Sequence, residues 1–104
     1  MNYRHAFHAG NFADVVKHVT VCALLEYLGR KAKPWCYVET HAGRGRYDLD
    51  GPEARRAGEW RDGIGRLMDA TGLPAALVRY LAQVRAMAGN EQRLRVYPGS
   101  PLLA

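Results

Sequence analysis

The sequence predicts an α/β fold, and three observations support that class. Apolar residues recur at helical spacing between residues 12 and 25, a continuous apolar run covers Trp35 to Val38, and the closely spaced glycines Gly43 and Gly45 follow that run. A helix, a short loop, a buried strand and a glycine turn are how an open α/β sheet begins. We therefore expect the first part of such a sheet, followed by a more helical region.

The first helix is predicted to begin after Asn11, which can cap its free amides, while Asp14 places a negative charge in the first turn. Its apolar residues cover most of the cylinder, so this helix is expected to have neighbours on several sides. Gly29 and the basic stretch 30–34 predict where it ends.

The run from Trp35 to Val38 is continuous and does not alternate with polar residues. That pattern predicts a central strand covered on both faces. The strand would end at the acid Glu39 and lead into a turn through Gly43 and Gly45, whose backbone can approach a ligand closely. The spacing does not match the dinucleotide or triphosphate fingerprints. The two glycines by themselves are equally compatible with a simple tight turn.

Two amphipathic helices are predicted next, over residues 55–70 and 74–88, and a short connection at 71–73 makes them a helical hairpin. Six arginines lie on this hairpin. A solvated charged face accounts for most of them, and RNA contact is the other interpretation.

The end of the sequence predicts a brief strand at 94–97 and then the start of a helix. Ser100 is a suitable N-cap, and Pro101 is suited to the first helical position. This predicted helix would start only one turn before the last residue. We therefore expect the chain to be an N-terminal fragment of a longer protein. The alternative is a frayed tail after a complete small domain.

The composition is that of a basic globular chain. Its 104 residues carry a net charge of +5, and twelve of the fifteen cationic residues are arginine. Arginine pairs bidentately with phosphate and stacks on bases, so this balance favours a nucleic-acid partner. Charge alone is a weak argument, because many unrelated small proteins are basic.

The two cysteines, Cys22 and Cys36, lie in apolar runs and are interpreted as buried thiols in a reducing compartment. No Cys-x-x-Cys or His-x-x-x-His spacing predicts a metal site. The first residues lack the apolar core of a signal peptide, and no apolar run approaches the length of about 20 residues that spans a membrane. We therefore expect a cytoplasmic protein that binds neither a membrane nor a metal.

Three blocks of the sequence resemble those of the RlmJ family, ribosomal RNA large-subunit methyltransferases that act on adenine N6. The blocks are Tyr3-Arg4-His5-x-Phe7-His8-Ala9-Gly10-Asn11-x-Ala13-Asp14-x-x-Lys17-His18, Glu39-Thr40-His41-Ala42-Gly43-Arg44-Gly45-Arg46-Tyr47 and Tyr97-Pro98-Gly99-Ser100-Pro101. The similarity extends over essentially the whole chain in the same order.

The resemblance implies a class I methyltransferase fold, in which a Rossmann-like sheet binds S-adenosylmethionine and a helical subdomain is inserted after the cofactor loop. Residues 1–47 would then hold the first helix, the first core strand and the glycine loop. Residues 48–97 would form the inserted subdomain, and 98–104 the start of the next core helix. The implied partner is 23S ribosomal RNA, and the implied parent enzyme is monomeric.

The resemblance also assigns residues to the site. His18, His41 and Ser100 would contact the cofactor, with Lys17 beside them and Gly43 and Gly45 in the loop. Tyr3 and His5 would lie near the target base.

Physical chemistry makes these roles reasonable. A helix start favours an anionic group such as the methionine carboxylate, and an aromatic ring can stack on an extruded adenine. The plainer alternatives are that His18 is an ordinary helix-face histidine, Tyr3 a packed terminal aromatic and Ser100 only a cap.

The catalytic loop of that family, Asp-Pro-Pro-Tyr, does not occur in this sequence, so no catalytic residue is assigned. We expect the isolated chain to be inactive, and marginally stable or prone to aggregate, because a buried strand needs partners on both sides. Two other functions stay open: a non-catalytic RNA-binding or regulatory module, and a truncated gene product without function.

Overall fold

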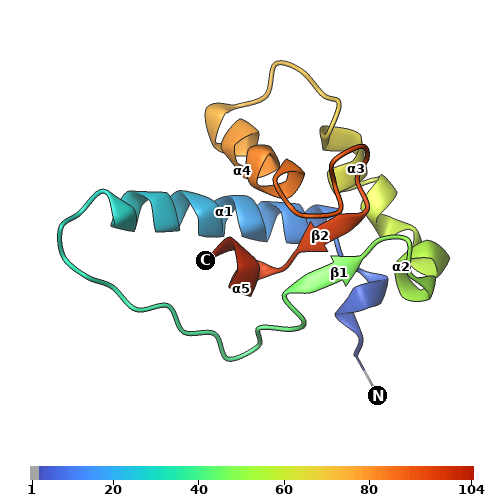
Figure 1. Ribbon diagram of the computed structural model, residues 1–104, viewed down its shortest axis with the longest axis horizontal. Helices are drawn as coiled ribbons and strands as arrows, with labels where there is room; N and C mark the ends of the chain where they lie inside the picture. Colours follow the sequence, from blue (N-terminus) through green and yellow to red (C-terminus); the bar gives the residue numbers. More distant parts are fainter. Residues whose placement is uncertain (1–2) are drawn as a thin grey trace.

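A computed structural model describes residues 3–104 and shows a mixed helical and β-structure built around one long helix (Figure 1). The α-helices are α1 (Phe12–Gly29), α2 (Pro52–Ala57), α3 (Ile64–Leu67), α4 (Ala75–Arg85) and α5 (Ser100–Leu103). Two short 3-10 helices, η1 (His5–Phe7) and η2 (Glu59–Arg61), and two strands, β1 (Arg46–Asp48) and β2 (Val96–Pro98), complete the elements. None of the helices formed by these residues has the length and hydropathy to span a membrane.

Helix α1 begins and ends as predicted. The Asn11 side chain accepts a hydrogen bond from the backbone N–H of Asp14 at 2.9 Å, and the helix ends at Gly29. Helix α4 packs on one side of α1, and α5 packs against it as well. The prediction of neighbours on several sides is confirmed for the faces that meet α4 and α5, but part of the apolar surface of α1 is uncovered within the described residues. The large exposed side chains of this helix are Phe12, Val16, Leu24 and Tyr27.

Strands β1 and β2 form a two-stranded antiparallel ribbon in which Tyr47 lies opposite Tyr97. The strand expected at 94–97 is present with its bounds shifted to Val96–Pro98. β1 was not predicted, because three residues are too few to show the alternation that identifies a strand. The ribbon joins the two ends of the chain segment that contains α2, α3 and α4 (Figure 1).

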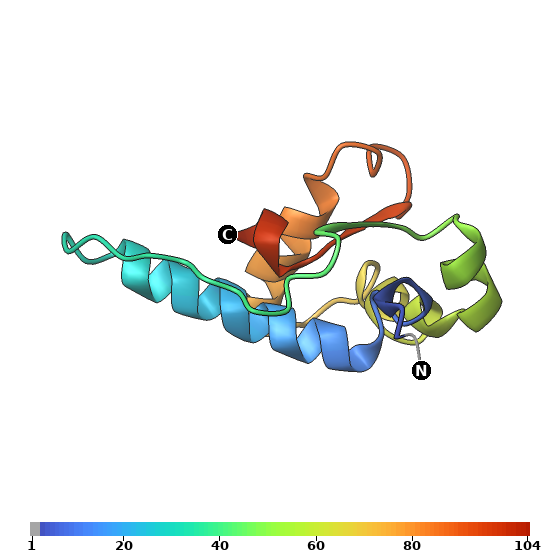
Figure 2. The same cartoon turned by 90° about the horizontal axis from the view of Figure 1, so that it is seen from below.

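The predicted central strand at Trp35 to Val38 is wrong for this structure. Residues 30–45 form a long connection that runs from the end of α1 back toward β1, as Figures 1 and 2 both show. Trp35 and Val38 are 43% and 78% exposed. A strand requires a neighbour to pair with, and β1 and β2 pair only with each other within residues 3–104.

The exposed connection also corrects the interpretation of the cysteines. Cys36 is exposed, because nothing in the described chain covers the segment that carries it, while Cys22 is half-buried and its burial raises the pKa of its thiol. Both thiols are free.

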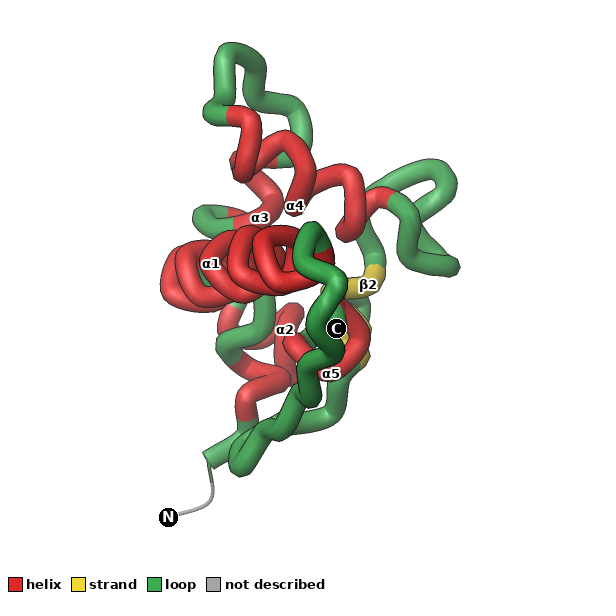
Figure 3. Tube along the Cα trace, turned by 90° about the vertical axis from the view of Figure 1, so that its left-hand side faces the viewer, coloured by secondary structure: helices red, strands yellow, loops and turns green. Residues whose placement is uncertain are grey.

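The helix predicted over 55–70 is divided into α2, η2 and α3. Gly58 adopts a left-handed backbone conformation with φ 65°, and its N–H bonds the carbonyl of Ala54, which ends α2 in the way that glycine commonly ends helices. The second predicted helix is confirmed as α4. In Figure 3, which views the molecule along α1, α3 and α4 lie on one side of that helix and α2 on another.

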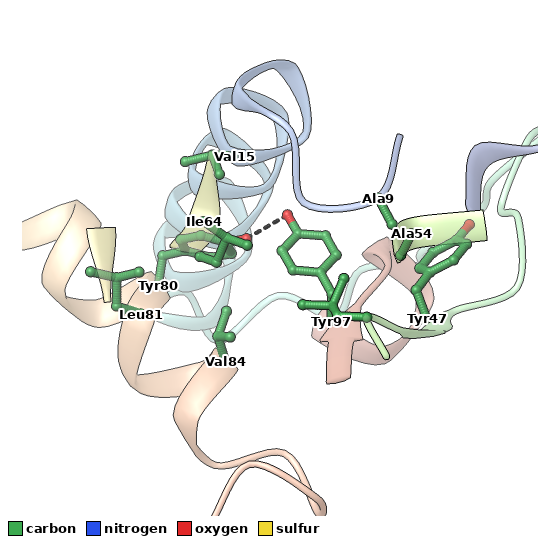
Figure 4. Close-up of a cluster of buried hydrophobic side chains, with 10 residues drawn as sticks. Ala9, Val15, Tyr47, Ala54, Ile64, Tyr80, Leu81, Val84 and Tyr97 are labelled. Atoms are coloured by element: carbon green, nitrogen blue, oxygen red, sulfur yellow. Dashed lines mark hydrogen bonds between the residues drawn. The ribbon is translucent and has the colours of Figure 1, made fainter. Parts of the chain in front are cut away.

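The core lies where α1, α4, the ribbon and the segment before α1 meet (Figure 4). Its buried members are Ala9, Val15, Tyr47, Leu49, Ala54, Ile64, Tyr80, Leu81, Val84 and Tyr97. The buried Asn90 fixes the return from α4 to β2 by four hydrogen bonds. Its side chain donates to the carbonyls of Val84 and Val96 and accepts from the N–H groups of Arg95 and Val96.

Candidate functional site

The glycine loop, residues 39–45, is held directly against the start of α5. Gly43 and Gly45 have φ of 69° and 78°, which only glycine adopts readily. The carbonyl of Gly45 accepts a hydrogen bond of 2.7 Å from the N–H of Gly99. A Cβ at Gly99 would lie 3.1 Å from the Cα of Gly45, so a larger residue would have to push the Gly45 backbone aside. This contact brings Glu39 and Ser100 to one place.

The Ser100 hydroxyl donates a hydrogen bond to Oε1 of Glu39. The prediction that Ser100 caps the helix is therefore wrong: Gly99 occupies the cap position, and the hydroxyl is used across the loop. The second oxygen of Glu39 is buried and has no hydrogen-bond partner. Burial raises the pKa of this carboxyl, but the hydrogen bond from Ser100, the nearby Tyr37 hydroxyl and the side chains of Lys17 and His18 outweigh it, so the net pKa is lowered.

His18 lies buried on α1 at the end of a chain of hydroxyl groups. Its Nδ1 is 2.6 Å from the Tyr97 hydroxyl, which is itself 2.6 Å from the hydroxyl of Tyr80 (Figure 4 shows the second bond). Burial raises the pKa of both tyrosines and lowers that of His18, so all three groups are neutral near pH 7.

The direction of this hydrogen-bond chain follows from the number of protons. If Tyr80 donates to Tyr97 and Tyr97 donates to Nδ1 of His18, every hydroxyl proton is used. The opposite direction would leave the buried Tyr80 proton without an acceptor, which is costly. We therefore assign the His18 proton to Nε2, where it is a donor for a ligand.

A second cluster forms at the N-terminal end of the described chain. Nε2 of His5 is 2.6 Å from Oδ2 of the buried Asp14, and the Tyr3 hydroxyl is 2.6 Å from Nδ1 of His5. A carboxylate only accepts, so Nε2 carries the His5 proton and Nδ1 accepts from Tyr3. Burial raises the pKa of Asp14, but the hydrogen bonds from His5 and the N–H of Gly10 outweigh it and the net pKa is lowered.

The N-terminal cluster and the glycine loop share a hollow of about 320 Å³. The Tyr47 ring joins them, since its centroid is 5.5 Å from that of His5 and its hydroxyl accepts from the N–H of Arg44. The residues that line the hollow are Tyr3, Arg4, His5, Ala6, Gly43, Arg44 and Tyr47. The two residues expected near the target base therefore lie beside a glycine of the loop expected to hold the cofactor.

The other predicted residues are placed less uniformly. His18 and Ser100 are both buried. Ser100 donates a hydrogen bond to Glu39, while His18 and the exposed Lys17 lie close enough to lower the pKa of Glu39. His41 is exposed and pairs with the neighbouring Thr40 hydroxyl at 2.9 Å. No hydrogen bond within residues 3–104 joins His41 to His18 or to Ser100.

The helix start also differs from the expectation of a free anion site. The carboxylate of Asp14 accepts from the N–H of Gly10, and Asn11 accepts from that of Asp14, so the chain's own side chains engage these amides. No group of three or more His, Cys, Asp or Glu side chains in the described chain is arranged to hold a metal ion.

Four further residues belong to this site but were not chosen from the sequence: Asp14, Glu39, Tyr47 and Tyr97. The signal for Glu39 was present, because it is the acid that opens the glycine loop. The signal for Asp14 was only its position in the first helical turn. Tyr97 stands in one of the three resembling blocks, but nothing local links it to His18, which is 79 positions away.

Comparison with known proteins defines the family to which this chain belongs. The family model described as "Ribosomal RNA large subunit methyltransferase D, RlmJ" matches residues 32–104. The chain therefore belongs to this family of ribosomal RNA methyltransferases, as its three sequence blocks predicted.

Among curated proteins, the chain is 45% identical over 104 residues to "Ribosomal RNA large subunit methyltransferase J" of Haemophilus influenzae. It is 48% identical over the same length to the protein of that name from Escherichia coli. Each comparison covers 100% of this chain and 37% of the relative, so the chain spans little more than a third of their length. A crystal structure of a Legionella pneumophila protein matches with a TM-score of 0.81 at 44% identity, covering 93% of this chain and 35% of the other.

Proposed function

We propose that this chain forms part of the cofactor and target-base site of a methyltransferase that uses S-adenosylmethionine to methylate N6 of an adenine in 23S ribosomal RNA. The observation that carries the proposal is the buried Glu39 oxygen without a hydrogen-bond partner, on a carboxyl that is bonded by Ser100 and lies near Lys17 and His18. The proposal includes a Rossmann-like sheet in the whole protein, with residues between β1 and β2 as its helical insertion, and a cytoplasmic location.

The residues at this place fit the proposed cofactor. A buried carboxylate oxygen requires a donor, and S-adenosylmethionine carries an ammonium group and ribose hydroxyls. The Nε2 proton of His18 and the ammonium of Lys17 suit its carboxylate. Gly43 and Gly45 let the loop backbone approach the ligand without side chains in between. When bound, the cofactor supplies an electrophilic methyl group on its sulfonium.

Tyr3 and His5 would position the base. Tyr3 is 72% exposed at the edge of the hollow, so the part of its ring that does not stack on His8 is available for an unpaired adenine. The hydrogen bonds from Asp14 through His5 fix the Tyr3 hydroxyl and therefore the ring. Asp14, buried and bonded to the backbone, is the anchor of this arrangement.

Titration with S-adenosylhomocysteine, the product form of the cofactor, tests the proposal by calorimetry. We expect saturable binding by the chain and weaker binding by Glu39→Gln, by about tenfold or more, because a hydrogen bond to a charged group contributes about 1.5–3 kcal/mol. Glu26→Gln is the matched control, since Glu26 carries the same charge but pairs with Arg30 and Arg79 on the exposed side of α1. Equal binding by Glu39→Gln and the original chain would contradict the assignment.

The same titration distinguishes the proposed methyltransferase site from the main alternative function. A non-catalytic RNA-binding module would bind RNA in a salt-dependent way without binding S-adenosylhomocysteine. Binding of the nucleoside by the chain supports the methyltransferase site, and we expect no methyl transfer by the 104 residues alone.

A further inference from the structure

We propose that a hollow formed by α2 and η2, lined by Arg55, Arg56 and Arg61, is a binding site for the phosphate groups of an RNA strand. This inference rests on the proposed function, since it takes RNA as the substrate, and it names where this chain holds the RNA backbone. It concerns a surface that is separate from the hollow at Tyr3 and from Glu39.

The three arginines share one open depression of about 650 Å³, which Asp50 and Pro52 also line. Gly58 reverses the chain after α2, so that Arg61 of η2 faces the same hollow as Arg55 and Arg56 at the end of α2. The Arg61 guanidinium lies 5.1 Å from the centroid of the Trp60 ring. This stacking restricts its motion, so less entropy is lost when it binds an anion.

The charge balance of the hollow favours an anion. No ion pair among residues 3–104 includes Arg55, Arg56 or Arg61. The nearby acid, Asp50, is engaged by Arg93 at 2.9 Å and by Arg95 at 3.3 Å. Three guanidinium groups without carboxylate partners therefore surround the depression. The guanidinium fork matches the geometry of a phosphate bidentately.

The hollow is rigidly connected to the place proposed for the target base. Helix α2 packs against η1, and the two elements lie side by side in Figures 1 and 2. Glu59 of η2 binds His8 at 2.7 Å and Asn11 at 3.1 Å. The His8 ring in turn stacks on Tyr3, with centroids 5.6 Å apart and planes 10° from parallel.

This connection gives the bound strand a defined course. A strand whose phosphates lie against the arginines would continue toward Tyr3, where an unpaired base can stack. Phosphate contacts fix the register of a nucleic acid without reading its sequence. The site would therefore position RNA of many sequences, and selection of the target would depend on other contacts.

The test compares two triple variants of equal charge for binding to a short unstructured RNA at several salt concentrations. Arg55→Gln/Arg56→Gln/Arg61→Gln removes the proposed site. Arg30→Gln/Arg66→Gln/Arg79→Gln is the control, because its residues belong to other parts of the chain and do not line this hollow. We expect the first variant to lose affinity at least tenfold more than the control. Its slope of log affinity against log salt should become shallower by about 0.7 for each phosphate that the variant no longer binds.

Equal losses in the two variants would overturn the inference, because general charge would then account for RNA binding. Binding of the original chain to vesicles of anionic lipid, lost in the first variant and without binding to RNA, would also overturn it. S-adenosylhomocysteine titration of both variants and of the original chain distinguishes failure of the arginine site from failure of the proposed function. Retained nucleoside binding with equal RNA losses refutes only the arginine site, whereas absent nucleoside binding by the original chain refutes the proposed function.

Discussion

The hydroxyl of Tyr97 lies 2.6 Å from Nδ1 of His18, and this contact joins the β-ribbon to a residue of the candidate cofactor site. Tyr97 stands in β2, where the chain returns from α4, and it also bonds Tyr80 of that helix. The helical part of the chain therefore fixes the tautomer of a side chain on α1.

Replacing Tyr97 with Phe would remove this hydroxyl and leave two buried polar groups, on His18 and Tyr80, without their partner. We expect the free energy of unfolding to fall by about 1–3 kcal/mol, the usual cost of unsatisfied buried groups. Urea unfolding measures the change. Tyr27→Phe is the control, because Tyr27 is 53% exposed, and it should change stability by less than about 0.5 kcal/mol. Equal stability of the two variants would contradict the hydrogen-bond chain.

His18 should also make stability depend on pH. Burial lowers its pKa in the folded chain, whereas in the unfolded chain it titrates near the ordinary value of about 6.5. The unfolded state then binds more protons, so the free energy of unfolding decreases as pH falls below about 6.5 and stops decreasing on this account below the folded pKa. The free energy of unfolding, plotted against pH over this range, should have a smaller slope for His18→Asn than for the original chain.

Asp14 should make the free energy of unfolding depend on pH in a more acidic range. Its pKa is lowered in the folded chain, so its contribution is complete above the unfolded value of about 3.9 and is lost as pH falls through the folded pKa. Asp14→Asn should remove part of the acid sensitivity, and it should also loosen His5 and Tyr3. Fluorescence or NMR of Tyr3 would report that loosening, and Asp69→Asn on the exposed surface should leave it unaltered.

The glycine loop can be tested with a closely matched pair. A Cβ at Gly43 would lie 2.5 Å from the Tyr47 hydroxyl, whereas a Cβ at Gly72, which has a similar positive φ of 72°, would meet no atom within 4 Å. Both Gly43→Ala and Gly72→Ala incur backbone strain of about 1–2 kcal/mol. Only Gly43→Ala displaces Tyr47, so it alone should weaken S-adenosylhomocysteine binding. A comparable loss in Gly72→Ala would show that strain, and not the site, controls the affinity.

The uncovered apolar side of α1 predicts self-association of the isolated chain. Val16 and Leu24 are 64% and 57% exposed, and exposed apolar patches promote aggregation. Val16→Lys/Leu24→Lys should increase the monomeric fraction in light scattering. Thr20→Lys/Ala23→Lys adds the same charge to the same helix without removing these side chains. If both pairs give the same increase, charge repulsion and not apolar contact is the cause.

The features that the sequence predicted correctly depend on local physics. The cap at Asn11, the end of α1 at Gly29 and the apolar spacing of α4 all involve residues within a few positions of one another. The two glycines of the loop likewise mark positive φ values that the chain requires at those positions. Such signals are readable without knowing the rest of the fold.

The errors arose where the outcome depends on distant contacts. The apolar run at Trp35 to Val38 has the composition of a strand, but pairing needs a neighbour that residues 3–104 do not supply. Ser100 has the properties of a cap, but Glu39, 61 positions away, takes its hydroxyl. The break at Gly58 was missed because glycine inside an amphipathic pattern is compatible with either continuation or termination.

The ribbon of β1 and β2 determines where the length of this chain could change without moving the glycine loop. Because Tyr47 and Tyr97 lie opposite each other, the chain departs and rejoins at a single location. Residues added or removed around Gly72, in the connection between α3 and α4, would leave the contact between Glu39 and Ser100 in place, because a side chain at Gly72 would meet no atom within 4 Å. Such an arrangement allows the connection between α3 and α4 to be lengthened or shortened while the glycine loop stays bonded to the start of α5.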